Sequence, residues 1–163
     1  MSDLFLERDA VISDCGKYRY LLRRSWDSEK PRALFVMLNP STADANIDDA
    51  TIRSCIRLSK ALGFGSFEVV NIFGYRATDP KELFTAAEPI GPMNERIVSA
   101  AVHRCDTVIC AWGAHPMAQR KAGFLLGYVR SNRPAVYCLG RTKSGAPKHP
   151  LYIKTETPLQ VFA

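Results

Sequence analysis

Apolar runs of strand length alternate with segments of helical character along most of this chain. Four near-continuous apolar stretches, of the kind expected for strands covered on both faces, occupy residues 32–38, 67–73, 107–112 and 135–140. Four segments predicted as helices, from helical apolar spacing or from an opening proline, occupy residues 48–62, 80–87, 92–104 and 116–130. Residues 10–23 predict a β-hairpin that turns at Asp14-Cys15-Gly16.

This order of elements predicts an α/β fold. Strands that alternate with helices are typical of a parallel sheet with helices on both faces. We therefore expect a three-layer α/β/α arrangement whose short, mainly parallel sheet has four strands and is accompanied by the N-terminal hairpin. The length of 163 residues suits one domain, so residues 1–163 are assigned to a single domain.

Composition places the chain among globular proteins, because 47% of its residues are hydrophobic and 23% are charged. Its apolar runs are far shorter than the roughly 20 residues that a membrane helix needs. The N-terminal segment MSDLFLERDA carries acids and lacks the basic-then-apolar pattern of a secretory signal. We therefore expect a cytoplasmic protein with no membrane partner.

The net charge of +6 favours anionic partners, which include nucleic acids, nucleotides and phosphorylated metabolites. Neither the G-x-x-x-x-G-K-[ST] phosphate-binding motif nor the G-x-G-x-x-G dinucleotide-binding motif occurs in the chain, which argues against both of these nucleotide-binding folds. Asp44, Asp48 and Asp49 are candidates for a metal site, but helix capping explains two of the three. We expect no metal and no cofactor.

Polar and aromatic side chains follow all four predicted strands, at the sheet edge where such folds bind ligands. They are Asn39, Ser41, Thr42 and Asp44, then Asn71, Tyr75, Arg76, Thr78 and Asp79, then Trp112 and His115, then Thr142, Lys143, Ser144, Lys148 and His149. Amides pair with base edges, rings stack on bases and cations hold phosphates. We therefore expect Asn39, Asn71, Trp112 and His149 to converge around one cleft that binds DNA or a nucleotide.

Most of these residues also have a structural alternative. Asn39 precedes a proline and can serve as a turn residue, and Asn71 can be a satisfied amide inside its strand. Trp112 can belong to the core, and His115 can cap the helix that follows it. His149 has no packing role in the sequence pattern, which favours a functional one.

The longer motifs of the chain are LNPSTADANIDDATIRSC, NIFGYRATDP, PIGPMNE, AWG and GAPKHPLY. Together they resemble, over residues 11–152, an uncharacterised bacterial and phage family catalogued only as a domain of unknown function, number 1643. That resemblance implies no activity. The order of motifs is also similar, at greater distance, to that of the uracil-DNA glycosylase superfamily. The second resemblance implies a uracil-DNA glycosylase-like fold and a site that acts on a base in DNA.

The distant resemblance implies a role for four residues. Asn39 in MLNPS is similar to the asparagine that positions the hydrolytic water in one branch of the superfamily. Asn71 in VVNIF is similar to the asparagine that reads the base in another branch. His149 in HPLY is similar to the histidine that stabilises the departing base, and Leu151 to the leucine that wedges into DNA. The resemblance thus implies that Asn39 and His149 are catalytic.

The other candidates are assigned to substrate binding. Trp112, in a WG pair similar to that of the classical uracil branch, or Tyr75 is expected to stack on the flipped base. The cations expected to hold phosphates are Arg76, Lys143 and Lys148. The remaining polar candidates are Ser41, Thr42, His115 and Thr142.

Two departures from the superfamily pattern keep three hypotheses open. No glycine flanks the first motif, where Leu38 precedes Asn39 and Ser41 follows Pro40, and the catalytic aspartate of the classical branch has no counterpart. The first hypothesis is a nucleobase-processing enzyme, such as a DNA base N-glycosylase of DNA repair. The second is a non-catalytic nucleotide or nucleic-acid binding module. The third is an enzyme that acts on a free nucleotide or another small anionic metabolite.

Overall fold

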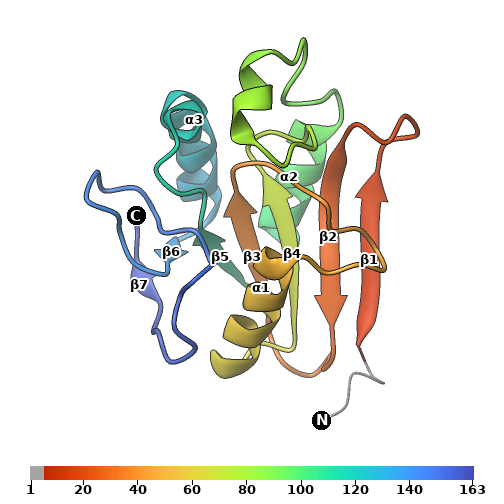
Figure 1. The fold of residues 1–163 in the computed structure, drawn as a ribbon. Helices are drawn as coiled ribbons and strands as arrows, with labels where there is room; N and C mark the ends of the chain where they lie inside the picture. The colour runs from red at the N-terminus through yellow and green to blue at the C-terminus, as the bar shows by residue number, and fades with distance from the viewer. Residues whose placement is uncertain (1–5) are drawn as a thin grey trace.

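A seven-stranded mixed sheet in the order β1-β2-β4-β3-β5-β6-β7 forms the centre of the molecule (Figure 1). The computed structural model describes residues 6–163, so the expectation drawn from the N-terminal segment falls partly on residues 1–5, outside the described residues. The strands are β1 (Glu7–Ile12), β2 (Arg19–Ser25), β3 (Arg32–Met37), β4 (Ser66–Asn71), β5 (Thr107–Cys110), β6 (Tyr137–Cys138) and β7 (Gln160–Val161).

Strands β4, β3, β5 and β6 run parallel to one another at the middle of the sheet. Met37, the last residue of β3, pairs with Asn71, the last residue of β4, and Val36 pairs with Cys110 at the end of β5. These three strands therefore end at nearly the same level, and the chain leaves them at one edge of the sheet. All four strands were predicted, although β6 is much shorter than the predicted 135–140.

The sheet is larger than the predicted four strands. The N-terminal hairpin is part of it, because β2 pairs antiparallel with β4 and β1 pairs with β2 on the outside. At the other edge, β7 pairs antiparallel with β6. Strand β2 joins the sheet because its apolar residues are buried beside the central strands, as Leu22 is opposite Val69. The four-strand prediction was wrong, whereas the mixed α/β class is confirmed.

Helices cover both faces of the sheet. Phe35 of β3 packs in one core cluster with α1, and its neighbour Val36 packs in the other with α2 and α3. Figure 1 accordingly shows α1 in front of the sheet and α2 behind it. The helices are α1 (Ala50–Ala61), α2 (Asn94–Arg104), α3 (Pro116–Asn132) and the 3₁₀ helix η2 (Pro80–Phe84). Within residues 6–163, no helix combines the length and apolarity needed to cross a membrane.

Side chains from the preceding loops start two of these helices. Asp49 Oδ1 accepts a hydrogen bond from the Ile52 N–H at 2.9 Å at the start of α1. His115 Nδ1 accepts from the Met117 N–H at 3.1 Å at the start of α3. Both caps satisfy first-turn N–H groups that have no intrahelical acceptor. The capping alternative for His115 is thereby confirmed.

Glu68 gathers three arginines on the face of β4 that carries α2. The Glu68 carboxylate is fully buried and contacts Arg32 Nη1 at 2.9 Å, Arg23 Nη2 at 3.3 Å and the Arg104 guanidinium. Burial alone would raise the pKa of Glu68, but the hydrogen bond from Arg104 and the charges of the three arginines together lower it. Part of the positive charge of the chain is therefore used inside the fold.

Candidate functional site

A pocket of about 310 Å³ lies at the sheet edge where β3, β4 and β5 end. It is lined by Arg19, Met37, Leu38, Asn39, Ser41, Asp49, Ala50, Thr51, Ile52, Asn71, Ala77, Thr78, Pro80, Trp112 and His149. Residues from five separate parts of the sequence therefore surround one cavity. The sequence-predicted site residues among them are Asn39, Ser41, Asn71, Trp112 and His149.

Asn71 places an amide inside this pocket. Its neighbours Val70 and Ile72 pack in the core under α2 and α3, so the alternation of β4 directs the Asn71 side chain to the opposite, α1 side. The residue is 1% exposed, and neither its Nδ2 nor its Oδ1 has a hydrogen-bond partner within residues 6–163. Because buried amides are normally bonded, this unpaired amide has hydrogen-bonding capacity that the fold leaves unused at the wall of the pocket.

Asn39 holds its amide in a fixed orientation. Its Nδ2 donates to Pro40 O at 3.0 Å and to Ala77 O at 2.8 Å. Carbonyl oxygens only accept, so the nitrogen must face them and Oδ1 must lie on the other side of the amide. The Ala77 N–H also donates to Pro40 O at 2.9 Å, which ties the segments after β3 and β4 together. Asn39 thus presents an acceptor at a defined place beside the pocket.

His149 presents a donor. Its Nδ1 accepts a hydrogen bond from the Leu151 N–H at 3.1 Å, so the proton of the neutral ring belongs to Nε2. Burial lowers the pKa of His149 below its usual value, and the charge of Asp49 acts in the opposite direction. The imidazole is therefore neutral at physiological pH. Its proton is on Nε2, and this N–H is the donor that the ring can offer to a ligand.

Trp112 lines the pocket as part of its wall. The ring is 6% exposed and packs edge-on against Phe162, with centroids 5.9 Å apart. The following Gly113 has φ +76°, and its N–H donates to Pro147 O at 2.9 Å. This contact brings the segment that carries His149 against the end of β5. The core alternative for Trp112 is confirmed, and stacking on a base stays a prediction.

Eight predicted site residues lie outside the lining of the pocket, and these are Thr42, Tyr75, Arg76, His115, Thr142, Lys143, Lys148 and Leu151. Tyr75 packs edge-on against Tyr18, and His115 caps α3. Thr142 lies in a turn of its own, where its N–H donates to Ala146 O at 2.8 Å. For these three residues local packing or hydrogen bonding explains the position.

Arg19 lines the pocket although the sequence did not indicate it. Val11 and Ile12, successive residues of β1, oppose Leu21 and Arg19, which leaves Tyr20 as the extra residue of a β-bulge. An extra residue inverts the alternation of side chains, so the Arg19 side chain faces the α1 side. No sequence pattern marks a bulge of this kind, which is why Arg19 was not among the sequence candidates.

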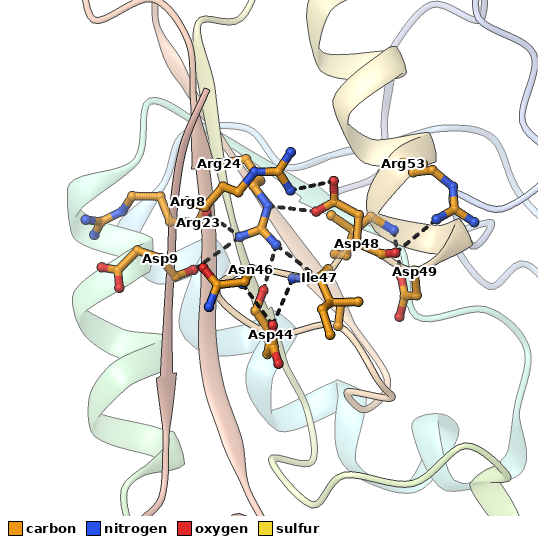
Figure 2. Close-up of polar contacts among 12 residues, drawn as sticks. Arg8, Asp9, Arg23, Arg24, Asp44, Asn46, Ile47, Asp48, Asp49 and Arg53 are labelled. Carbon is orange, nitrogen blue, oxygen red and sulfur yellow. Dashed lines mark hydrogen bonds and ion pairs between the residues drawn. The ribbon is translucent and has the colours of Figure 1, made fainter. Parts of the chain in front are cut away.

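Asp49 is the second lining residue that the sequence analysis did not place in the site. From the sequence it was considered as a helix cap and as a candidate metal ligand; it does cap α1, and it also lines the pocket. The connection that carries it is fastened to β2 by Arg24, as Figure 2 shows. Arg24 Nε donates to Asp48 Oδ1 at 2.9 Å, and its Nη2 donates to Asp44 O at 2.6 Å.

The three acidic residues of this connection have separate structural roles. Asp44 Oδ1 accepts from the Asn46 and Ile47 N–H groups at 2.8 Å, and these bonds lower the pKa of Asp44. Asp48 pairs with Arg24, and Asp49 caps α1. Within the described part of the chain, no group of three His, Cys, Asp or Glu side chains is arranged to hold a metal ion.

A larger hollow of about 710 Å³ lies between α2 and α3 and shares Asn71 with the pocket. Asn94 Nδ2 donates there to Asn71 O at 2.9 Å, so the hollow meets the backbone of Asn71. Its rim carries Arg120, Lys121 and the 82% exposed Phe124. The hollow thus lies on the α2 and α3 side of Asn71, opposite the pocket on the α1 side.

The family model described as "Protein of unknown function (DUF1643)" matches residues 19–151. The chain belongs to this family. In this DUF1643 protein, every lining residue of the pocket, from Arg19 to His149, falls within the matched range, whereas β1 and β7 lie outside it. Comparison with curated proteins and with solved structures returned no match. The DUF1643 description assigns no activity, so the chemistry must be argued from the geometry of the pocket.

Proposed function

We propose that the pocket binds a nucleobase and that the protein hydrolyses the bond between that base and its sugar, as a DNA base N-glycosylase with a uracil-DNA glycosylase-like site. The unpaired amide of Asn71 at the wall of the pocket carries this proposal. An amide offers a donor and an acceptor side by side, which is the pattern that base edges complement. A volume of about 310 Å³ is at the small end of ligand pockets and suits one base with its sugar.

The neighbouring groups suit the hydrolytic step. Asn39 Oδ1 accepts a hydrogen bond from water and orients it toward the sugar carbon. The water oxygen bonds to that carbon, the carbon–nitrogen bond breaks, and its electron pair leaves with the base. His149 Nε2–H donates to the negative charge that grows on the base, and the carboxylate of Asp49 takes the proton that water loses. A flipped base reaches these groups only when it has left the stack.

A base-release assay tests the proposal. Single-stranded and duplex oligodeoxynucleotides with normal and damaged bases, and the matching free nucleosides, are incubated with the protein, and released base is quantified by chromatography. We expect at least one substrate to lose its base. Asn39→Ala and His149→Ala are each expected to lower kcat by about 10²–10³, the usual effect of removing one group that stabilises the transition state.

His103→Ala is the matched control, because His103 lies exposed in the last turn of α2 and bonds Tyr128 Oη at 3.0 Å. It is expected to keep wild-type kcat. Release of no base from any substrate, or unchanged rates in the Asn39 and His149 variants, would contradict the proposal. An oligonucleotide that binds but keeps all its bases would instead support the non-catalytic binding module.

A further inference from the structure

Arg19 is a buried cation on the wall of the pocket. It is 3% exposed, and its Nη1 donates to Ala43 O at 3.1 Å. Its buried Nε has no acceptor in the part of the chain that the structure describes, and no carboxylate there lies within ion-pair distance of it. Proteins normally pair a buried charge, because an unpaired one is costly. The pocket therefore offers a site for an anion.

The guanidinium keeps its charge at neutral pH. Burial lowers the pKa of Arg19 to about 10, which is still well above neutrality. The charge of Asp49 raises the pKa, while the neighbouring Arg76 and Arg24 lower it. Asp49 also has its Oδ1 engaged by the Ile52 N–H. An anionic ligand would thus meet a permanent positive charge.

The start of α1 adds positive potential at the same place. Ala50 and Thr51, the first residues of this 12-residue helix, line the pocket together with Arg19. Asp49 accepts from the Ile52 N–H, whereas the N–H groups of Ala50 and Thr51 have no acceptor within residues 6–163, and the helix dipole concentrates partial positive charge there. The buried guanidinium and the helix N-terminus are two independent features that favour the same kind of ligand group.

We propose that Arg19 and the first turn of α1 bind a phosphate group of the ligand whose base contacts Asn71. The proposal rests on the proposed function for the base and names the substrate class, a nucleotide that is either free or part of a DNA strand. The guanidinium fork donates to phosphate oxygens, and backbone N–H groups at a helix N-terminus do the same. The phosphate thereby supplies the acceptor for Arg19 Nε.

Calorimetric titration of the full chain tests this inference with four kinds of probe. They are the four common deoxynucleosides, their 5′-monophosphates, 2-deoxyribose 5-phosphate and a single-stranded oligodeoxynucleotide. We expect at least one monophosphate, or the oligonucleotide, to bind about tenfold or more tightly than the matching nucleoside. Arg19→Gln is expected to remove that preference, so that nucleoside and monophosphate bind the variant with similar affinity. Preference for the free monophosphate or for the oligonucleotide identifies the source of the phosphate.

Arg53→Gln is the matched control, since Arg53 is an exposed residue of α1 that lies outside the lining and is expected to keep the preference. If Arg19→Gln does not fold, Arg19→Lys keeps the positive charge but lacks the forked guanidinium, and it is expected to weaken the preference for the monophosphate.

Nucleoside and monophosphate binding of equal strength would overturn the phosphate site and leave the nucleobase proposal standing. Arg19-dependent binding of 2-deoxyribose 5-phosphate without discrimination among bases would support the phosphate site and contradict the proposed function. Failure of every phosphate-bearing probe to bind would overturn the inference.

Discussion

The two asparagines of the pocket differ in what holds their amides. Asn39 uses its nitrogen to fasten the segments after β3 and β4, through bonds to Pro40 O and Ala77 O. Asn71 holds its unpaired amide at the end of a strand that is itself fixed by ladder bonds. Replacement of Asn39 therefore changes a loop together with the proposed ligand contact, whereas replacement of Asn71 tests the proposed contact more directly.

His149 makes the stability of the fold depend on pH. Burial, opposed by the charge of Asp49, lowers its pKa below the usual 6.5, so on acidification the unfolded chain takes up this proton before the folded chain does. The contribution of His149 to the free energy of unfolding is expected to be complete above pH 6.5, the usual pKa of histidine. It should decrease as the pH falls through 6.5 and should stop decreasing below the pKa of His149 in the folded chain. Urea unfolding at about pH 7.5 and about pH 5.5 measures the difference. His149→Gln should lose this part of the pH dependence, and an identical dependence in the variant would contradict the assignment.

Sequence patterns indicated some of these residues and hid others. Asn71 interrupts an apolar strand, and His149 lies in a segment without a packing role, so both were visible as candidates. Arg19 was hidden because an extra residue in β2 redirects it, and Asp49 because its capping role accounted for it fully. A bulge, as at Arg19, has no local sequence pattern. A residue with two roles, such as Asp49, also shows only one of them in the sequence.

At the scale of elements, the connection between β3 and α1 depends on one buried side chain. Arg24 is fully buried and bonds Asp48 and Asp44 O, whereas Arg8 reaches the same Asp48 from a partly exposed position, as Figure 2 shows. Arg24→Met is expected to lower the free energy of unfolding by about 1–3 kcal/mol, because it removes the bonds of a fully buried guanidinium to Asp48 Oδ1 and Asp44 O, while Arg8 still pairs with Asp48. Arg8→Met is expected to cost about 0–1 kcal/mol, as exposed ion pairs do. Urea denaturation compares the two, and equal losses would show that Arg24 has no special role.

The elements themselves were largely predictable, and their arrangement less so. The buried parallel strands and the helices show clear apolar periods, which is why β3, β4, α1 and α3 closely match their predicted ranges. The place of β2 beside β4 depends on contacts between segments distant in sequence, which no local pattern encodes. Strand β6 is short because only Tyr137 and Cys138 pair with its neighbours β5 and β7.

At the scale of the whole molecule, the net charge of +6 overstates the cations available to a ligand. Several arginines are used inside the fold, around Glu68 and Asp48. The predicted phosphate contacts Lys143 and Lys148 are exposed beside the segment that carries His149. If these lysines contact phosphates, the affinity of the protein for nucleic acid should decrease as the salt concentration rises.

The affinity for a labelled single-stranded oligodeoxynucleotide is expected to fall steeply between about 50 and about 200 mM salt. Lys143→Ala and Lys148→Ala should each reduce the slope of log K against log salt by about 0.7, the value for one phosphate contact on a single strand. Lys60→Ala is the control, because Lys60 lies at the far end of α1 over the Trp26 ring. A slope near zero in the wild type would exclude contacts to phosphates.

The two borders of the sheet have a consequence for how copies of the protein meet at high concentration. An outermost strand carries free N–H and C=O groups that invite a foreign strand, and such pairing leads to aggregation. Here β1 begins with the charged residues Glu7, Arg8 and Asp9, and β7 comprises only Gln160 and Val161. The charges of β1 and the short length of β7 leave few edge groups with which a strand of another copy could pair. High concentration alone is therefore not expected to cause fibril formation.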